Sequence, residues 1–272
     1  MKINYNRGGI FQSFDANRQR YEENLKSSAS FKQENDIFIK QKKKETKKAI
    51  AKAALFGAIA PVVFANVLKG RGKILTDTMK NSASALKDKA KAVYNMFEIE
   101  SYTDMLLSTT GAIVGGTAAG IIKDKNPENR EEKYREGIFE FLNNMTPTTL
   151  VAIGETYSQK TGKFTSAPAK AALIAGSVAG GMFIANKTSN KINEKLFDKN
   201  NPEHKKHHKR NFKPTDCLVH MDDILGLLVL AKIPLAKKIQ ADKFLPLLYA
   251  KAGFEAGDAR CAKPDSKKCD RI

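Results

Sequence analysis

Residues 105–122 read MLLSTTGAIVGGTAAGII and contain no charged side chain. The stretch holds two Gly-x-x-x-Gly pairs, Gly111 with Gly115 and Gly116 with Gly120. Residues four apart fall on one face of a helix, and small side chains there let a second backbone come close. We therefore predict a helix whose glycine faces pack against other helices.

A second glycine-rich apolar stretch spans residues 171–185 and contains Gly176, Gly180 and Gly181. Glycine in a helix interior costs about 1 kcal/mol relative to alanine, so a helix that keeps several must recover this through close packing. We predict helix–helix contacts at the glycines of both stretches. One arrangement that the pattern allows packs the two glycine-rich helices on each other.

The fold predicted from these patterns is all-α, a multi-helix bundle with two glycine-rich apolar helices. No segment alternates apolar and polar residues with the period of a half-buried strand. Residues 73–97 have the best amphipathic pattern and predict one helix with a basic polar face, which would cover the core or, as the other interpretation, lie on a membrane surface. Pro61 predicts a kink or break within residues 53–68, and Pro147 predicts the start of a separate short helix.

Similar segments follow the two glycine-rich stretches in the same order. DKNPE at 124–128 resembles DKNNPE at 198–203, and PTTLV at 147–151 resembles PTDCLV at 214–219. Internal repeats determine architecture where they exist, so this order favours a duplication. Glycine-alanine helices and Asn-Pro turns also recur by chance, and the sequence leaves both interpretations open.

The chain divides by composition into three parts. Residues 1–48 form a charged leader and a solvated, partly disordered helix, because apolar positions are too sparse for a core-facing stripe. Residues 49–252 form the helical core, which would contain the two repeats, about residues 105–156 and 169–230. Residues 253–272 are charged, and we expect a flexible tail.

The chain is strongly basic, with a formal net charge of +18 at pH 7. Such a charge draws a protein to anionic polymers or anionic lipid surfaces. A lysine-rich run lies directly before the uncharged residues 53–68. Because polybasic segments beside apolar ones attract anionic headgroups, we expect contact with an anionic surface; a solvated helix face is the other interpretation. The contacting residues would be Lys42, Lys43, Lys44, Lys47 and Lys48.

Membrane insertion is a second question that hydropathy raises. Residues 105–122 reach the lower limit of length for a membrane-spanning helix, whereas the other uncharged runs are short enough for buried core helices. Basic residues occur in loops on both sides of these runs, which conflicts with a simple polytopic arrangement. A single span, a re-entrant hairpin or interfacial helices agree better. Because residues 1–35 contain no apolar secretory segment, we expect a membrane-associated protein with a cytoplasmic N-terminus.

Patterns that carry chemistry are missing from the sequence. It contains neither a phosphate-binding Gly-rich loop nor a nucleophile elbow, so we predict no catalytic residue, cofactor or small-molecule substrate. His204, His207 and His208 lie among lysines, which disfavour a cation, and we predict no metal site there. Three cysteines in a chain of this length do not form a disulfide framework.

Two hypotheses of function follow. The first is a membrane-associated helical protein without catalysis, whose partners are an anionic lipid surface or further copies of itself. The alternative is a soluble basic helical module that binds nucleic acid or an acidic partner. The basic runs lack interleaved aromatic residues for base stacking, which favours the first hypothesis. An enzyme or transporter would have only the duplication in its support.

Overall fold

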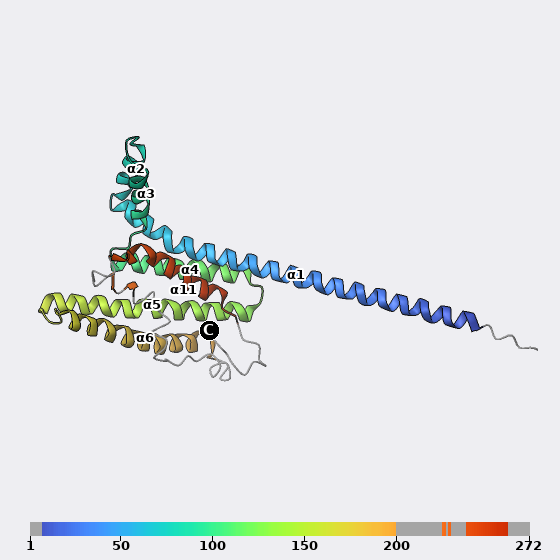
Figure 1. The fold of residues 1–272 in the computed structure, drawn as a ribbon. Helices are drawn as coiled ribbons and strands as arrows, with labels where there is room; N and C mark the ends of the chain where they lie inside the picture. The colour runs from blue at the N-terminus through green and yellow to red at the C-terminus, as the bar shows by residue number, and fades with distance from the viewer. Residues whose placement is uncertain (1–6, 200–224, 227, 230–237, 261–272) are drawn as a thin grey trace, which may run out of the picture. The chain divides into compact units, whose positions relative to one another are not determined.

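The computed structural model describes residues 7–199, 225–226, 228–229 and 238–260. This part of the chain is helical and contains no strand, so the predicted all-α fold is confirmed (Figure 1). The helices are α1 (Arg7–Leu68), α2 (Arg71–Lys80), α3 (Leu86–Tyr94), the 3-10 turn η1 (Asn95–Phe97), α4 (Tyr102–Lys123), α5 (Pro127–Thr161), α6 (Ala167–Phe197) and α11 (Ala241–Asp258).

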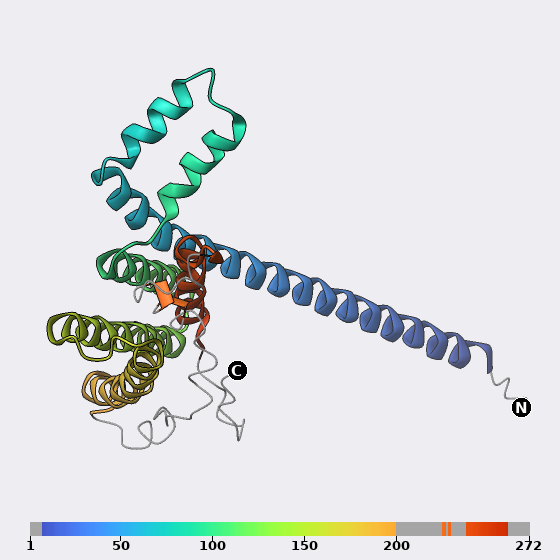
Figure 2. The ribbon, with the colours of Figure 1, turned by 60° about the vertical axis from the view of Figure 1, so that its left-hand side comes forward.

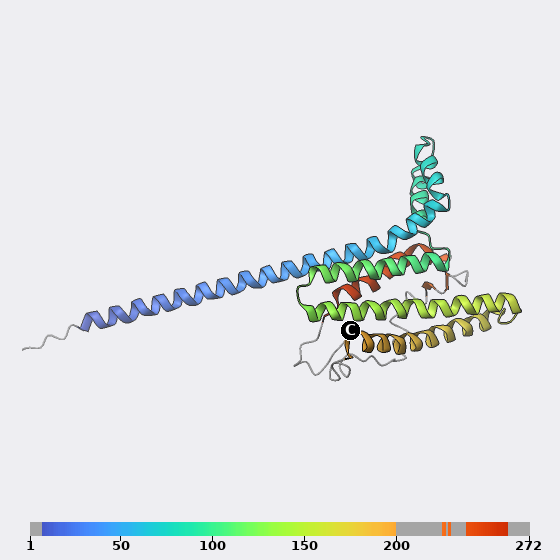
Figure 3. The same ribbon diagram turned by 180° about the vertical axis from the view of Figure 1, so that it is seen from behind.

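The chain divides into two units, residues 1–47 and residues 48–272. The first unit belongs, from Arg7 onward, to the long helix α1. The second unit contains the end of α1 and all the other helices. Within it α4 packs along α11 and α5, and α5 packs along α6; Figures 2 and 3 show these helices side by side.

Local sequence signals account for the starts of α4 and α5. Ser101 and Asp104 form a capping box, in which the Ser101 hydroxyl accepts a hydrogen bond from the Asp104 N–H. At α5, the Asn126 side chain accepts from the Glu128 N–H at 3.0 Å. Pro127 occupies the first helical position of α5, where a missing N–H costs nothing.

Helix α1 continues through Pro61 to Leu68, so residues 53–68 belong to one helix rather than two. Proline at this position leaves the carbonyl of Gly57, four residues earlier, without its helical donor. The backbone of Gly111 in α4 lies directly against that carbonyl. The Gly57 carbonyl therefore lies in a close contact between two helices rather than in a helical hydrogen bond.

Residues 73–97 form two helices and a 3-10 turn, so the prediction of one continuous amphipathic helix is wrong. The break lies at Asn81, whose side chain accepts a hydrogen bond from the Ala83 N–H at 3.0 Å. Its carbonyl also accepts from the Ser84 N–H at 3.2 Å. Asn and Ser offer the backbone these local bonds in competition with helix, which the apolar periodicity does not register.

The prediction that Pro147 starts a new helix is also wrong, because α5 runs unbroken from Pro127 to Thr161. Side chains near the proline bond to helix carbonyls. Thr148 donates to the Asn144 carbonyl at 2.7 Å, and Thr149 donates to the Met145 carbonyl at 2.7 Å. These bonds satisfy backbone acceptors around the site where the ladder is interrupted.

Helix α11 extends beyond the boundary expected at residue 253. It ends at Asp258, and Gly253, Ala256 and Gly257 are buried. The charges of Glu255 and Asp258 suggested a tail, but they share this helix with a small-residue face that packs on α4. Residues 253–258 are therefore part of the helical core rather than of a flexible tail.

Candidate functional site: glycine contacts and the apolar outer surface

The first glycine pair of α4 faces α1. A Cβ atom added at Gly111 would overlap the Gly57 carbonyl oxygen, and one added at Gly57 would overlap the Gly111 carbonyl oxygen. One turn further along, a Cβ at Gly115 would lie 2.6 Å from the Ala53 carbonyl oxygen. Because real Cβ atoms do not approach so closely, the two backbones come together only where side chains are absent.

The second glycine pair of α4 faces α11. A Cβ at Gly116 would overlap the Gly253 carbonyl oxygen, and one at Gly120 would overlap the Gly257 carbonyl oxygen. Gly253 and Gly257 are themselves four residues apart, so two Gly-x-x-x-Gly faces meet. Helix α4 therefore has two glycine faces, each against a different neighbour, and it forms the centre of this helix group.

The glycines of α6 have a different environment. A Cβ added at Gly176 or Gly180 would meet nothing within 4 Å, whereas one at Gly181 would lie 2.5 Å from the Pro147 Cα atom. Only Gly181 therefore lies at a close contact, and its neighbour is α5. The glycines of the two glycine-rich helices do not meet each other in the structure.

Three glycines whose contacts are with the α4 backbone were missed from the sequence: Gly57, Gly253 and Gly257. Each carries a readable signal. Gly253 and Gly257 have the same spacing as the pairs of α4, and Gly57 follows Ala53 at the same interval. Small residues four apart were the rule that identified α4, and the same rule applies to these positions.

Buried polar side chains join α1 to α4 and to the segment around η1. The Ser108 hydroxyl of α4 donates to the Ala58 carbonyl of α1 at 2.9 Å. Asn66, which is fully buried in α1, donates to the carbonyls of Met96 at 3.0 Å and Glu98 at 2.9 Å. Hydrogen bonds between helices fix the position of closely packed segments that have few large side chains.

Helix α1 buries alanine, isoleucine, valine and asparagine side chains and places its largest apolar side chains, those of phenylalanine, outward. Its inward positions recur every four residues from Ile50, and all of them are at most 1% exposed. They are Ile50, Ala54, Ala58, Val62 and Asn66. The outward side carries Phe56 at 74% exposure and Phe64 at 64%. This distribution is the reverse of the usual one, in which the largest apolar side chains are buried.

Helix α4 has a similar exposed stripe. Leu107, Val114 and Ile122 are 41%, 60% and 75% exposed. Spacings of seven and eight residues place them on one face of the helix. Large apolar side chains therefore form part of the outer surface of both helices that meet at Gly57 and Gly111.

Within the part of the chain that the structure describes, three helices are long and apolar enough to cross a membrane. They are the segment Asn35–Leu68 of α1, the whole of α4 (Tyr102–Lys123) and the segment Pro168–Phe197 of α6. A helix rises about 1.5 Å per residue, and a hydrocarbon core of about 30 Å needs roughly 20 residues. The two helices with exposed apolar stripes, α1 and α4, are among the three.

A buried lysine of α5 binds the aspartate that follows α4. Lys133 of α5 is 2% exposed and donates to the Asp124 carboxylate at 3.0 Å and to the Ala259 carbonyl at 2.6 Å. Partial burial opposes ionisation of Asp124, but the hydrogen bond from the Asn126 N–H and the Lys133 ammonium outweigh it. The pKa of Asp124 therefore lies below its ordinary value. Lys133 thus joins the end of α4 to the residue that follows α11.

An arginine two residues further along α5 binds the aspartate that follows α6. Arg135 donates to the Asp198 carboxylate at 3.1 Å and to the Glu131 carboxylate at 2.7 Å. Burial opposes the charge of Arg135, but these carboxylates outweigh that effect and raise its pKa. Asp124 and Asp198 follow the two glycine-rich helices, so α5 holds both helix ends with neighbouring basic side chains.

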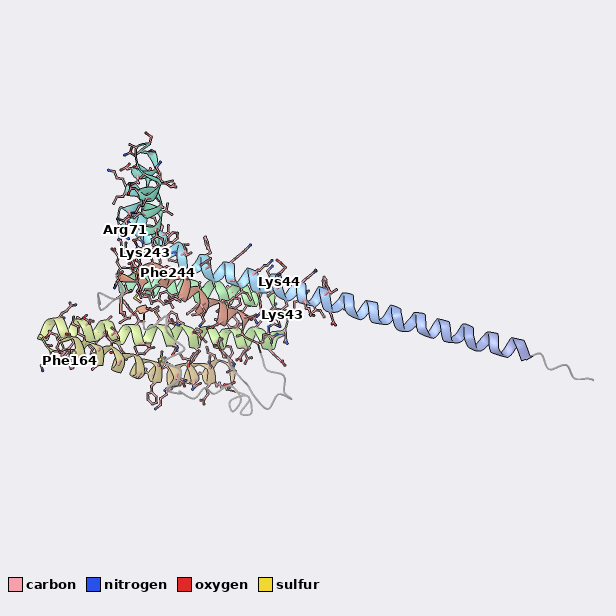
Figure 4. All side chains as sticks on the ribbon, viewed as in Figure 1. Lys43, Lys44, Arg71, Phe164, Lys243 and Phe244 are labelled. Atoms are coloured by element: carbon pink, nitrogen blue, oxygen red, sulfur yellow. The ribbon has the colours of Figure 1, made fainter. Side chains whose placement is uncertain are left out.

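The lysines expected at an anionic surface all lie on α1. Lys42, Lys43, Lys44 and Lys48 are exposed and Lys47 is half-buried; Figure 4 labels Lys43 and Lys44. Lys42, Lys43 and Lys44 thus form an exposed basic run on α1. His204, His207 and His208, for which no metal was predicted, lie outside the described residues.

The architecture defines a helical bundle with candidate membrane spans. The chain matched no protein-family model, no curated protein and no solved structure.

Proposed function

We propose that this chain is a membrane-associated helical protein without catalytic activity of its own. Its glycine-faced helices pack within the bilayer, and the basic run of α1 contacts anionic headgroups. The observation that supports this most is the distribution of side chains on α1 and α4. Backbones meet at glycine and alanine, while phenylalanine, leucine, valine and isoleucine lie outside.

The physical reason lies in the solvent. In water, burial of apolar surface contributes roughly 25 cal/mol per Å², which favours placing Phe56 and Phe64 inside. In lipid this driving force between helices disappears, and close backbone packing with interhelical hydrogen bonds takes its place. The contacts at Gly57, Gly111 and Ser108 have that character.

Lipid contact is proposed for the outward faces of α1 and α4 rather than for the whole bundle. Helix α11 carries an exposed ion pair, Lys251 with Glu255 at 3.3 Å. Charged groups within a bilayer are costly unless they face a protein interior or water. The exposed face of α11 therefore suits water, headgroups or another protein surface.

Extraction from membranes tests the proposal. Membranes that contain the full chain are washed with high salt and, separately, with alkaline carbonate. We expect the chain to stay with the membrane in both washes. Release by salt alone would indicate peripheral electrostatic attachment. A chain found in the soluble fraction before any wash contradicts the proposal, and salt-sensitive binding to nucleic acid would then support the soluble alternative.

A further inference from the structure

The helical hairpin α2–α3 differs from the other described helices of the second unit, each of which contains buried residues. Neither helix contains a buried residue. The hairpin follows the candidate span that ends at Leu68 and precedes the one that begins at Tyr102. It therefore connects two helices that can cross a membrane, and contributes little to the core.

One face of α3 is apolar and open. Leu86 is 84% exposed and Val93 is 42% exposed, and Ala90 between them is also exposed. Their spacings of four and three residues place the three on the same face of the helix. Lys87 and Lys89 flank this face. Long lysine stems can lie along apolar surface while their ammonium groups reach a polar one.

The base of the hairpin is fixed to the core. Arg71 donates to the Asn95 carbonyl at 2.9 Å and to the Glu98 carboxylate at 2.8 Å. The Lys243 ammonium lies 4.9 Å from the ring centre of Tyr94, and the Phe244 ring packs edge-on against Tyr94 at 6.5 Å. Figure 4 labels Arg71, Lys243 and Phe244. The base is thus anchored, whereas Leu86 lies beyond these contacts.

We propose that the α2–α3 hairpin lies on an anionic lipid surface, with Leu86, Ala90 and Val93 inserted between headgroups. Charge complementarity identifies the occupant, because residues 71–94 contain six basic and only two acidic side chains. An amphipathic helix with an apolar face and lysines beside it is suited to the plane of the interface. The proposal rests on the proposed function, which brings the chain to the membrane.

The position of the α2–α3 hairpin in the chain also supports contact with a lipid surface. A segment between two candidate spans begins and ends near the membrane surface if both cross, so the hairpin reaches that surface without a long connection. Binding of nucleic acid would employ the lysines, but it would leave the leucine and valine exposed to water. An anionic lipid surface accommodates both the charged and the apolar side chains.

An environment-sensitive fluorophore tests the insertion. In the full chain with Cys217, Cys261 and Cys269 replaced by serine, a single site is introduced as Leu86→Cys, Val93→Cys or Asp88→Cys and labelled. Asp88 lies on the opposite face of α3 and is the matched control. Each protein is mixed with vesicles of phosphatidylcholine alone or with phosphatidylglycerol added, and vesicle-bound protein is measured by flotation.

We expect a blue shift and protection from an aqueous quencher at residues 86 and 93 with phosphatidylglycerol vesicles, and neither effect at residue 88. Lys87→Gln and Lys91→Gln should each weaken the preference for anionic vesicles about fivefold. Protein that floats with vesicles without a shift at residues 86 and 93 overturns this inference and leaves the proposed function standing. Protein that does not float contradicts the proposed function as well.

Discussion

Gly57 of α1 and Gly111 of α4 face each other so closely that a methyl group on either would overlap the carbonyl oxygen of the other. The carbonyl of Gly57 is also the one that Pro61 deprives of its helical hydrogen bond. The close contact and the proline therefore involve the same carbonyl group. Replacement of either glycine must separate the two helices at the point where their backbones come nearest.

Gly111→Ala should lower the free energy of unfolding by about 1–3 kcal/mol, because the added methyl group meets backbone that cannot rotate away. The matched control is Gly176→Ala, where the structure leaves open space. That substitution should stabilise α6 by up to about 1 kcal/mol through helix propensity. Thermal unfolding of both variants in the same detergent measures the difference, and equal effects would contradict the packing described for α4.

A second pair of substitutions tests the contact of α4 with α11. Gly257→Ala places its Cβ against the Gly116 carbonyl and should lower the free energy of unfolding by about 1–3 kcal/mol. Gly72→Ala, in the first turn of α2, meets only atoms of Val67, at 3.4 Å or more, which is ordinary contact, so this variant should be no less stable than the parent chain. Urea unfolding followed by circular dichroism measures both variants. If Gly257→Ala is as stable as the parent chain, residues 253–258 are not part of the core.

The sequence predicted which segments are helical better than it predicted which helices pack against each other. Glycines four apart in residues 105–122 indicated a closely packed helix, but this spacing does not say which backbone lies opposite. The same spacing at Gly253 and Gly257 was overlooked because nearby charges suggested a tail. The outcome at α6 shows the limit of the rule, because Gly176 and Gly180 have the spacing but a Cβ added at either would meet nothing within 4 Å.

Helix boundaries were harder to predict, for a local reason. Pro147 does not start a new helix, because α5 continues through it; at Pro61, where a kinked helix or two short helices were expected, α1 continues as one helix. Asparagine was given too little weight at Asn81, where its side chain ends a helix. At Asn81 the bond that ends the helix joins a side chain to a backbone group, which hydrophobic periodicity does not describe.

Asp124 should make stability depend on acidity. Its pKa is lowered in the folded chain, so its ionised form stabilises the fold above the unfolded-state value of about 3.9, and this contribution is lost as the pH falls through the folded pKa. Asp124→Asn should lower the free energy of unfolding at pH 7 by about 1–3 kcal/mol. Between about pH 5 and pH 2 the variant should lose less stability than the parent chain. Parallel acid-side slopes in denaturant titrations would contradict this account.

The basic run of α1 should control binding to anionic lipid. Each change among Lys42→Gln, Lys43→Gln and Lys44→Gln should weaken binding to phosphatidylglycerol-containing vesicles about fivefold at low salt. The effects should diminish as salt is added, since screening shortens the range of the attraction. The control is Lys251→Gln, whose lysine is paired with Glu255 on α11. Vesicle flotation across a salt series measures these affinities, and an unchanged affinity in the triple variant would exclude this surface.

Val114→Arg distinguishes a membrane-spanning α4 from a helix in water. Val114 is 60% exposed and lies near the middle of the candidate span Tyr102–Lys123. On a surface in water, a substitution at such a position changes stability by only about 0.5 kcal/mol. At the centre of a bilayer, arginine costs about 2.5–3.5 kcal/mol on the scale of helix insertion.

Tyr134→Arg is the matched control, because Tyr134 is 50% exposed on α5, outside the candidate spans. We expect Val114→Arg to reduce the carbonate-resistant fraction strongly and Tyr134→Arg to leave it unchanged. If both variants insert like the parent chain, the exposed stripe of α4 does not face lipid, and its leucine, valine and isoleucine must have another partner.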